Sequence, residues 1–119
     1  MLRITDILDS VHHFLPAAEQ EMIEKAYIFS AAVHKGQVRL SGEPYLTHPL
    51  EVAGILADMK MDASTIVTGL LHDTVEDTLT TLEEIETAFG REVAFLVDGL
   101  TKLSKISFRS QEERQAENF

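Results

Sequence analysis

The chain has 119 residues, of which 45% are hydrophobic, and it carries a formal net charge of −10 at pH 7. This length and composition suit one domain with its own hydrophobic core. The acidic balance argues against binding nucleic acid through general basicity, and no apolar run is long enough to cross a membrane. The absence of cysteine excludes disulfides and thiolate metal ligands. We therefore expect a cytoplasmic protein with neither a nucleic acid nor a membrane as its partner.

Two helices are predicted before residue 36. The first is short, begins at a cap formed by Thr5 or Asp6, and ends at Pro16. The second runs over roughly Ala17 to His34, and Gly36 follows it in the C′ position.

The segment from 36 to 49 contains two glycines and two prolines and has no helical period, so it is predicted to be a loop. Lys35 and Arg39 make it a local basic exception in an acidic chain. Arg39 could offer a forked set of donors to a phosphate, and Ser41 and Tyr45 could donate hydroxyl hydrogen bonds. Taken alone this is a weak phosphate signal, because solvated arginines are common in loops.

Helical patterns fill the rest of the chain. Pro49 suits the first turn of a third helix, and a fourth runs from the Asp62 cap through Ala63 to about Thr74. A fifth begins at a capping box of Thr81 with Glu84, ends at Gly90, and is followed by a sixth carrying the apolar residues of 93–100. A further capping box, Ser110 with Glu113, predicts a last helix of barely two turns. The predicted fold is all-α, a compact array of about six helices without β-strands.

The segment His72-Asp73-Thr74-Val75-Glu76-Asp77 places one imidazole and three carboxylates within six residues. If the fourth helix continued through it, His72, Asp73, Glu76 and Asp77 would fall at about 0°, 100°, 40° and 140° around one helix. Carboxylates at this spacing repel one another, and the negative end of a helix dipole adds to the cost. A bound cation would turn this electrostatic repulsion into a net attraction. The pattern therefore predicts a metal site with acid and base groups beside it.

Each histidine also has a structural interpretation. His12 and His13 have no chemical neighbours in the sequence and are interpreted as surface or packing residues. His34 would interact favourably with the dipole at the end of its helix, a role as well supported as a catalytic one. His48 lies at the entrance of the third helix, where a lone histidine is commonly a cap or core residue. Its role as a ligand depends on pairing with His72.

Several motifs occur in order from about Ala26 to Phe119. They are His34-Lys35-Gly36-Gln37-Val38-Arg39, Ser41-Gly42-Glu43-Pro44-Tyr45, His48-Pro49, Leu70-Leu71-His72-Asp73-Thr74-Val75-Glu76-Asp77-Thr78 and Val97-Asp98-Gly99-Leu100-Thr101-Lys102-Leu103. Together they closely resemble the N-terminal HD hydrolase domain of the RelA/SpoT family, which handles the alarmones ppGpp and pppGpp in the stringent response. We therefore expect residues 1–119 to form a single HD-type phosphohydrolase domain.

The resemblance implies a role for each matching residue. His48, His72 and Asp73 would be metal ligands, with manganese as the usual ion. Glu76 and Asp77 match a pair implicated in activating the attacking water. Arg39 and Ser41 match positions that meet the nucleotide. The implied reaction removes the 3′-pyrophosphate of guanosine tetra- or pentaphosphate, giving GDP or GTP and pyrophosphate. The resemblance also raises the expectation of a downstream synthetase domain in a parent protein.

Two departures from the family pattern weaken the expected activity. Position 40 is Leu40, where many relatives carry a basic residue. The fourth family ligand is an aspartate within a segment resembling Leu-Ala-Asp-Arg-x-His-Asn, which does not occur before Phe119. We therefore expect the domain to lack its last helices, the manganese site to be weak or empty, and hydrolysis by this chain alone to be poor.

Three alternatives stay open. The chain could be a non-catalytic module, either regulatory or a homo-oligomer formed through its last helix. It could be an HD hydrolase for other nucleotides, which the loop from Gln37 to His48 argues against. In the plainest alternative, residues 72–77 are only a solvated acidic helix end.

Overall fold

The computed structural model describes residues 2–37, 42 and 44–118, and the side chains of 107–109 and 116–118 lie outside this description. The helices are α1 (Ile4–Val11), α2 (Ala17–Val33), α3 (Thr47–Asp58), α4 (Ala63–Leu71), α5 (Thr74–Asp77), α6 (Leu82–Phe89) and α7 (Arg91–Asn118). No strand occurs among the described residues, so the all-α prediction is confirmed. None of these helices combines the length and apolar sequence that a bilayer crossing requires.

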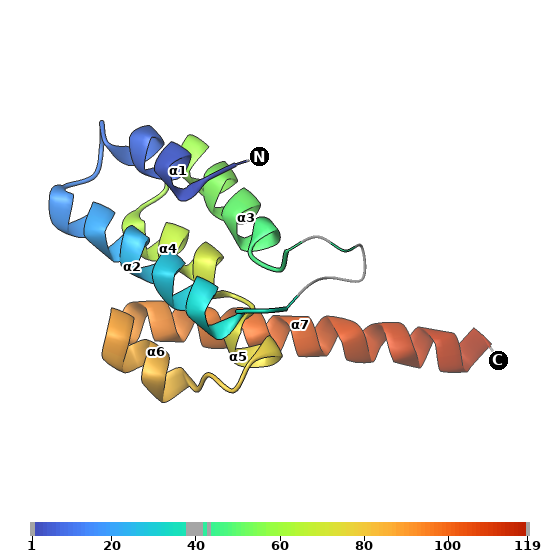
Figure 1. The fold of residues 1–119 in the computed structure, drawn as a ribbon. Coiled ribbons are helices and arrows are strands. Elements are labelled where there is room, and N and C mark those ends of the chain that lie inside the picture. The colour runs from blue at the N-terminus through green and yellow to red at the C-terminus, as the bar shows by residue number, and fades with distance from the viewer. Residues whose placement is uncertain (1, 38–41, 43, 119) are drawn as a thin grey trace.

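Helix α4 lies at the centre of the domain (Figure 1), where it contacts α2, α3 and α7. Seven of its nine residues are buried, as expected for a mostly apolar helix that packs against several others. Its fully buried core side chains are Ile66, Val67, Leu70 and Leu71. The end of α4 is consequently held in a fixed position relative to three other helices, and this end carries the His-Asp pair.

Gly69 allows α3 and α4 to approach closely. A Cβ atom at this position would lie 2.9 Å from Leu56 Cδ1, 3.3 Å from Val52 Cγ1 and 3.7 Å from Ala53 Cα. All three neighbours belong to α3. The missing side chain therefore sets the separation of the two helices that carry His48 and the His-Asp pair.

The predicted start of α4 is confirmed, but its predicted end is wrong. Asp62 Oδ1 accepts a hydrogen bond from the Thr65 amide at 3.0 Å, as an N-cap residue does. The helix stops at Leu71, and two side chains beyond this point bond carbonyls of its last turn. His72 Nδ1 bonds the Gly69 carbonyl at 2.7 Å, and Thr74 Oγ1 donates to the Leu71 carbonyl at 2.8 Å. These contacts mark the corner without excluding a helical amide, because a carbonyl has two lone pairs.

The chain then turns into α5, a single helical turn. The Asp77 amide donates to the Asp73 carbonyl at 2.9 Å, and the Thr78 amide donates to the Thr74 carbonyl at 3.1 Å. The assumption that residues 72–77 share one continuous helix is therefore wrong. Asp73 lies in the corner between α4 and α5, and Glu76 and Asp77 lie on the second, separate turn.

The limits of α6 follow the predicted signals. Thr81 Oγ1 accepts from the Glu84 amide at 3.2 Å, which confirms the capping function of Thr81. Gly90 has a φ of 97° and ends the helix, and a positive φ at this point favours glycine over other residues.

Helix α7 differs from the prediction in its second half. The pattern of Ser110 with Glu113 predicted a new helix, but α7 continues without a break from Arg91 to Asn118. Residues 100–118 include no glycine or proline, and most of them are good helix formers. Helical backbone therefore continues through Ser110. The C-terminal part of α7 extends away from the other helices (Figure 1), and the domain measures 54 × 32 × 27 Å.

Of two smaller predictions, one needs correction and the other is confirmed. The first helix begins at Ile4, with Arg3 as its N-cap, rather than at Thr5 or Asp6. Asp6 still caps this end, because its carboxylate accepts from the Arg3 amide at 2.8 Å. Helix α3 begins at Thr47, which agrees with the position predicted for Pro49. Pro49 remains within the first turn, where its missing amide hydrogen has no helical partner to lose.

Candidate metal centre

His48, His72 and Asp73 lie together although 23 residues separate the two histidines in the sequence. His48 belongs to the first turn of α3, and the His-Asp pair follows α4. One potential ligand atom from each side chain lies within 4.8 Å of the other two. The two imidazole rings have their centroids 5.3 Å apart and their planes at 66°. This is the group of three donors that the sequence predicted.

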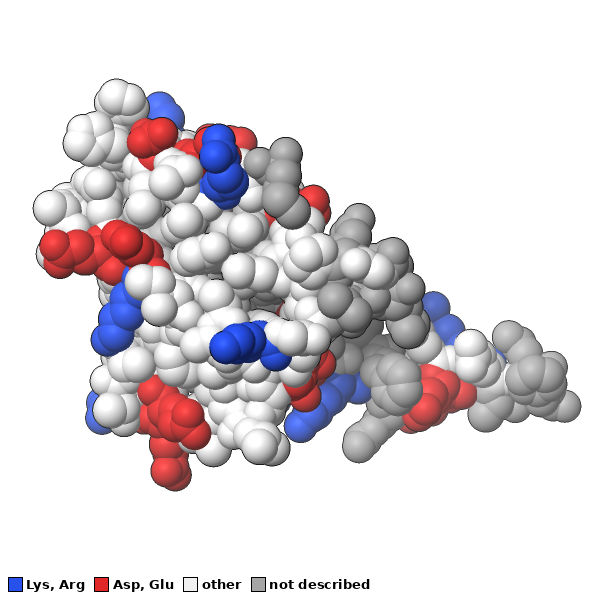
Figure 2. Space-filling view, viewed as in Figure 1, with Lys and Arg blue, Asp and Glu red and all other residues white. Residues whose placement is uncertain are grey.

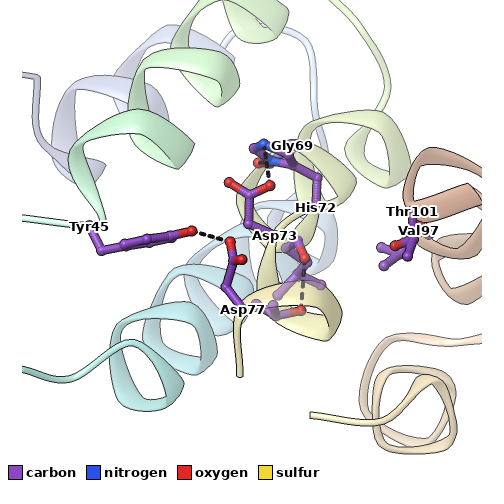
Figure 3. A network of polar contacts seen from close by, with 9 residues as sticks. Tyr45, Gly69, His72, Asp73, Asp77, Val97 and Thr101 are labelled. Carbon is purple, nitrogen blue, oxygen red and sulfur yellow. Dashed lines mark hydrogen bonds and ion pairs between the residues drawn. The ribbon is translucent and has the colours of Figure 1, made fainter. Parts of the chain in front are cut away.

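The orientation of His72 suits it to metal binding (Figure 3). Its Nδ1 lies 2.7 Å from the Gly69 carbonyl oxygen, which can only accept a hydrogen bond. Nδ1 must therefore carry the proton, and Nε2 faces Asp73 Oδ1 at 3.2 Å. A backbone carbonyl on the second ring nitrogen fixes the tautomer in many metal-bound histidines. The His72 and Asp73 side chains are 19% and 21% exposed, so the site is sheltered and still open to solvent.

Electrostatic attraction holds His72 and Asp73 together. Burial alone lowers the pKa of His72, but its hydrogen bonds and the charges of Asp73 and Glu76 outweigh burial and raise the pKa above its usual value. Burial alone raises the pKa of Asp73, but the hydrogen bond and charge of His72, with smaller effects of two other histidines, lower it overall. The opposite shifts reflect one attraction, which keeps the two donors adjacent.

Glu76 and Asp77 lie beside this group on α5. Both residues are exposed, and Glu76 is close enough for its charge to raise the pKa of His72. The Tyr45 hydroxyl donates a hydrogen bond to the Asp77 carboxylate. In Figure 3 the Asp77 carboxylate points toward Tyr45, whereas the Asp73 carboxylate points toward the His72 ring. The corner between α4 and α5 therefore brings metal-type donors and additional carboxylates to one side of the molecule, by a different geometry from the predicted helix.

The other candidate residues divide into three cases. Arg39 and Ser41, predicted to meet the nucleotide, lie outside the described residues, as does Leu40. His12 and His13 are exposed, with ring centroids 5.8 Å apart, and they lie outside the group of three donors. His34 is buried and also lies outside that group.

Sequence reasoning missed two contributions to this site. Gly69 supplies both the close packing of α3 and the carbonyl that orients His72. Gln37 donates from Nε2 to the Asp77 carbonyl at 3.3 Å. For Gly69 a signal existed, because a glycine within an otherwise apolar helix often marks a close helix contact. For Gln37 the sequence offers no such signal.

Two hollows flank the centre. On the side of Glu76 and Asp77 an open cavity of about 650 Å³ reaches Gln37 and Thr80. On the other side a groove of about 560 Å³ touches His72 and is mostly apolar. The groove is lined by α3, α4 and α7 through Val52, Leu56, Thr65, Thr68, Gly69, His72, Phe95, Leu96, Gly99, Leu100 and Leu103. Over the face shown in Figure 2, lysine and arginine side chains are spread among acidic and uncharged ones.

Residues 26–119 match the family model described as "HD domain". The chain belongs to the HD-domain family. This HD domain is 62% identical over 113 residues to a GTP pyrophosphokinase of Myxococcus xanthus, a match that covers 92% of the chain and 15% of the relative. It is 48% identical over 109 residues to the bifunctional (p)ppGpp synthase/hydrolase SpoT of Escherichia coli K12, covering 92% of the chain and 16% of that protein.

A third relative is the GTP pyrophosphokinase rsh of Brucella melitensis, 46% identical over 118 residues and matched over 99% of the chain and 16% of its own length. The HD domain thus spans only 15–16% of the length of these three relatives. Their names confirm the resemblance to RelA/SpoT proteins that the motifs indicated. The activities in those names describe the relatives themselves.

Proposed function

We propose that this HD domain binds a divalent cation, with manganese as the expected ion, and hydrolyses the 3′-pyrophosphate of ppGpp or pppGpp. The observation that carries the proposal is the convergence of His48, His72 and Asp73, whose donor atoms lie within 4.8 Å of one another. Two relatives, SpoT of E. coli K12 and a protein of E. coli O157:H7, carry (p)ppGpp hydrolase activity in their names. The downstream synthetase domain, the cytoplasmic location and the residues of the nucleotide pocket stay predictions.

The donor set fits such an ion. Two imidazoles and one carboxylate suit a transition metal better than they suit calcium, which prefers sites made of oxygen atoms alone. The Gly69 carbonyl already holds the His72 tautomer that leaves Nε2 available. When bound, a divalent ion lowers the pKa of water and polarises a phosphoryl oxygen. The chain itself supplies the groups that hold the ion and the groups that handle protons.

We assign the proton transfer to α5. Glu76 is exposed and next to His72, so it can accept a proton from the attacking water as a general base. Asp77, held by Tyr45, is the second carboxylate at the same corner. Water adds to phosphorus, the bond from phosphorus to the 3′ oxygen breaks, and that oxygen takes up a proton as pyrophosphate leaves. In a chain of net charge −10, Arg39 would offset the charge of the substrate.

The test measures manganese binding by titration calorimetry and pyrophosphate release from ppGpp on the same preparation. His72→Ala removes a proposed ligand, and His12→Ala is the matched control, because His12 is exposed and lies outside the donor group. We expect loss of manganese binding and of hydrolysis in His72→Ala, and no change in His12→Ala. Wild-type binding and hydrolysis in His72→Ala would refute the assignment.

A second candidate function is a non-catalytic module. The observation in its favour is that three donors gather among the described residues, whereas the family pattern includes a fourth ligand, an aspartate. For the same reason we propose that hydrolysis by this chain alone is slow, below the roughly 1 per second at the low end of typical turnover numbers. If the wild-type chain binds no manganese and releases no pyrophosphate, the non-catalytic function replaces the hydrolase.

A further inference from the structure

His34 is a buried, polar side chain to which the proposed chemistry gives no role. It is the residue at the end of α2 and is 3% exposed. Its Nε2 is buried and has no hydrogen-bond partner among the described residues. A buried polar atom without a partner costs free energy, so the rest of the side chain must make contacts that compensate. Two of its contacts, with Gln37 and with Tyr45, lead toward Asp77.

The first path leads through Gln37 to the backbone of Asp77. Gln37 Nε2 donates to the Asp77 carbonyl at 3.3 Å, and because a carbonyl can only accept, this contact fixes which end of the Gln37 amide is which. Gln37 Oε1 therefore faces His34 Nδ1, 3.0 Å away, and Nδ1 is the donor. His34 thus holds Gln37, and Gln37 holds the carbonyl of Asp77.

The second path leads through Tyr45 to the carboxylate of Asp77. The His34 and Tyr45 rings are stacked, with centroids 4.6 Å apart and planes at 20°. The Tyr45 hydroxyl donates to the Asp77 carboxylate. The Tyr45 amide also donates to the Gln37 carbonyl at 3.3 Å, which joins the two paths. His34, Gln37, Tyr45 and Asp77 therefore form a closed ring of contacts.

From this ring we propose that His34 is a positioning residue that holds the Asp77 carboxylate in one orientation, through its stack on Tyr45 and its hydrogen bond to Gln37. The elements involved are the end of α2, the residues before α3, and α5. Asp77 is exposed, so without the ring its side chain would be free to sample several rotamers. The consequence for catalysis rests on the proposed function, whereas the consequence for the orientation of Asp77 does not.

Three variants separate the two paths. Tyr45→Phe keeps the stack on His34 and removes the hydroxyl that contacts the carboxylate. Gln37→Ala removes the path to the backbone. His34→Asn retains a hydrogen-bond donor near the place of Nδ1 but loses the stack. It is used in place of His34→Ala, because the cavity left by alanine could prevent folding. His12→Ala again serves as the control.

The primary readout is the set of three-bond couplings to the β protons of Asp77 by NMR, which report its χ1 rotamers without any need for turnover. We expect one dominant rotamer in the wild type and in His12→Ala, and averaged couplings in Tyr45→Phe and His34→Asn. In Gln37→Ala the couplings should change less, and the amide shifts of residues 77 and 78 should change more. A single, unchanged Asp77 rotamer in folded His34→Asn would overturn the proposal.

Kinetics then test the link to the reaction. We expect His34→Asn to lower kcat roughly tenfold to a hundredfold, as misplacement of a reacting group does, with manganese affinity unchanged. In an Asp77→Asn background the same substitution should have almost no further effect. A purely structural role predicts the same loss in both backgrounds. If the wild type hydrolyses nothing, the proposed function fails, and the Asp77 couplings still decide whether His34 positions that side chain.

Discussion

Gly69→Ala tests how far the separation of α3 and α4 controls the candidate site. The added Cβ would lie 2.9 Å from Leu56 Cδ1 and 3.3 Å from Val52 Cγ1. The Leu56 methyl can rotate away at small cost, but Val52 is β-branched and has one strongly preferred rotamer in a helix. We expect α3 to shift at Val52. Because His48 precedes Val52 by one helical turn, it should shift with it, away from His72.

The size of the effect follows from two opposing contributions. Overpacking a core typically costs about 1–3 kcal/mol, and alanine is better than glycine within a helix by about 1 kcal/mol. Gly69→Ala should therefore change the free energy of unfolding by between about zero and 2 kcal/mol of destabilisation. Gly99→Ala is the matched control, because Gly99 lies within α7 and a Cβ there meets nothing within 4 Å. This control should stabilise the protein by about 1 kcal/mol.

Urea denaturation of the wild type and the two variants gives the change in unfolding free energy for each substitution. The difference between these two changes isolates the packing cost at about 1–3 kcal/mol. Calorimetry on the same samples should show weaker manganese binding in Gly69→Ala and wild-type binding in Gly99→Ala. The reasoning is refuted if Gly69→Ala stabilises the fold as much as Gly99→Ala does.

Three further changes probe the ends of α4. Asp62→Ala should cost about 0.5–2 kcal/mol in urea denaturation. The hydrogen bonds with Thr65 lower the pKa of Asp62 below its usual 3.8; the charged cap therefore stabilises the fold above that value and loses its effect as the pH falls through the lower folded-state pKa. Asp62→Asn should retain the cap and lose this pH dependence, and an unchanged acid limb in Asp62→Asn would contradict the assignment. Thr74→Val removes the donor to the buried Leu71 carbonyl and should lower the free energy of unfolding by about 1–3 kcal/mol. A thermal midpoint equal to that of the wild type would contradict this prediction.

The sequence predicted the helix starts that depend on local hydrogen bonds. Asp62 and Thr81 cap α4 and α6 as expected, because each cap depends on residues three positions away. The end of α4 could not be predicted in this way. At this corner the side chains of His72 and Thr74 bond carbonyls of the preceding turn, and the period of the apolar residues contains no information about such side-chain contacts.

The candidate site shows the same division. The motifs identified His48, His72 and Asp73, and the fold brings them together. The connection of Tyr45 and Gln37 to Asp77 joins residues 32 and 40 positions apart, which single-sequence patterns do not relate. For Tyr45 the sequence suggested a phosphate donor, whereas in the structure its hydroxyl bonds Asp77.

The length of α7 has a consequence for how the domain opens. Val93, Val97 and Thr101 are buried and tie the first half of the helix to the core, whereas residues 102–106 and 110–115 are all exposed. Amide hydrogens in the first half should exchange with solvent only when the whole domain unfolds, and those in the second half should exchange by fraying from the end. One continuous helix therefore contains a gradient of protection, with its steepest change near Thr101, one helical turn beyond Val97.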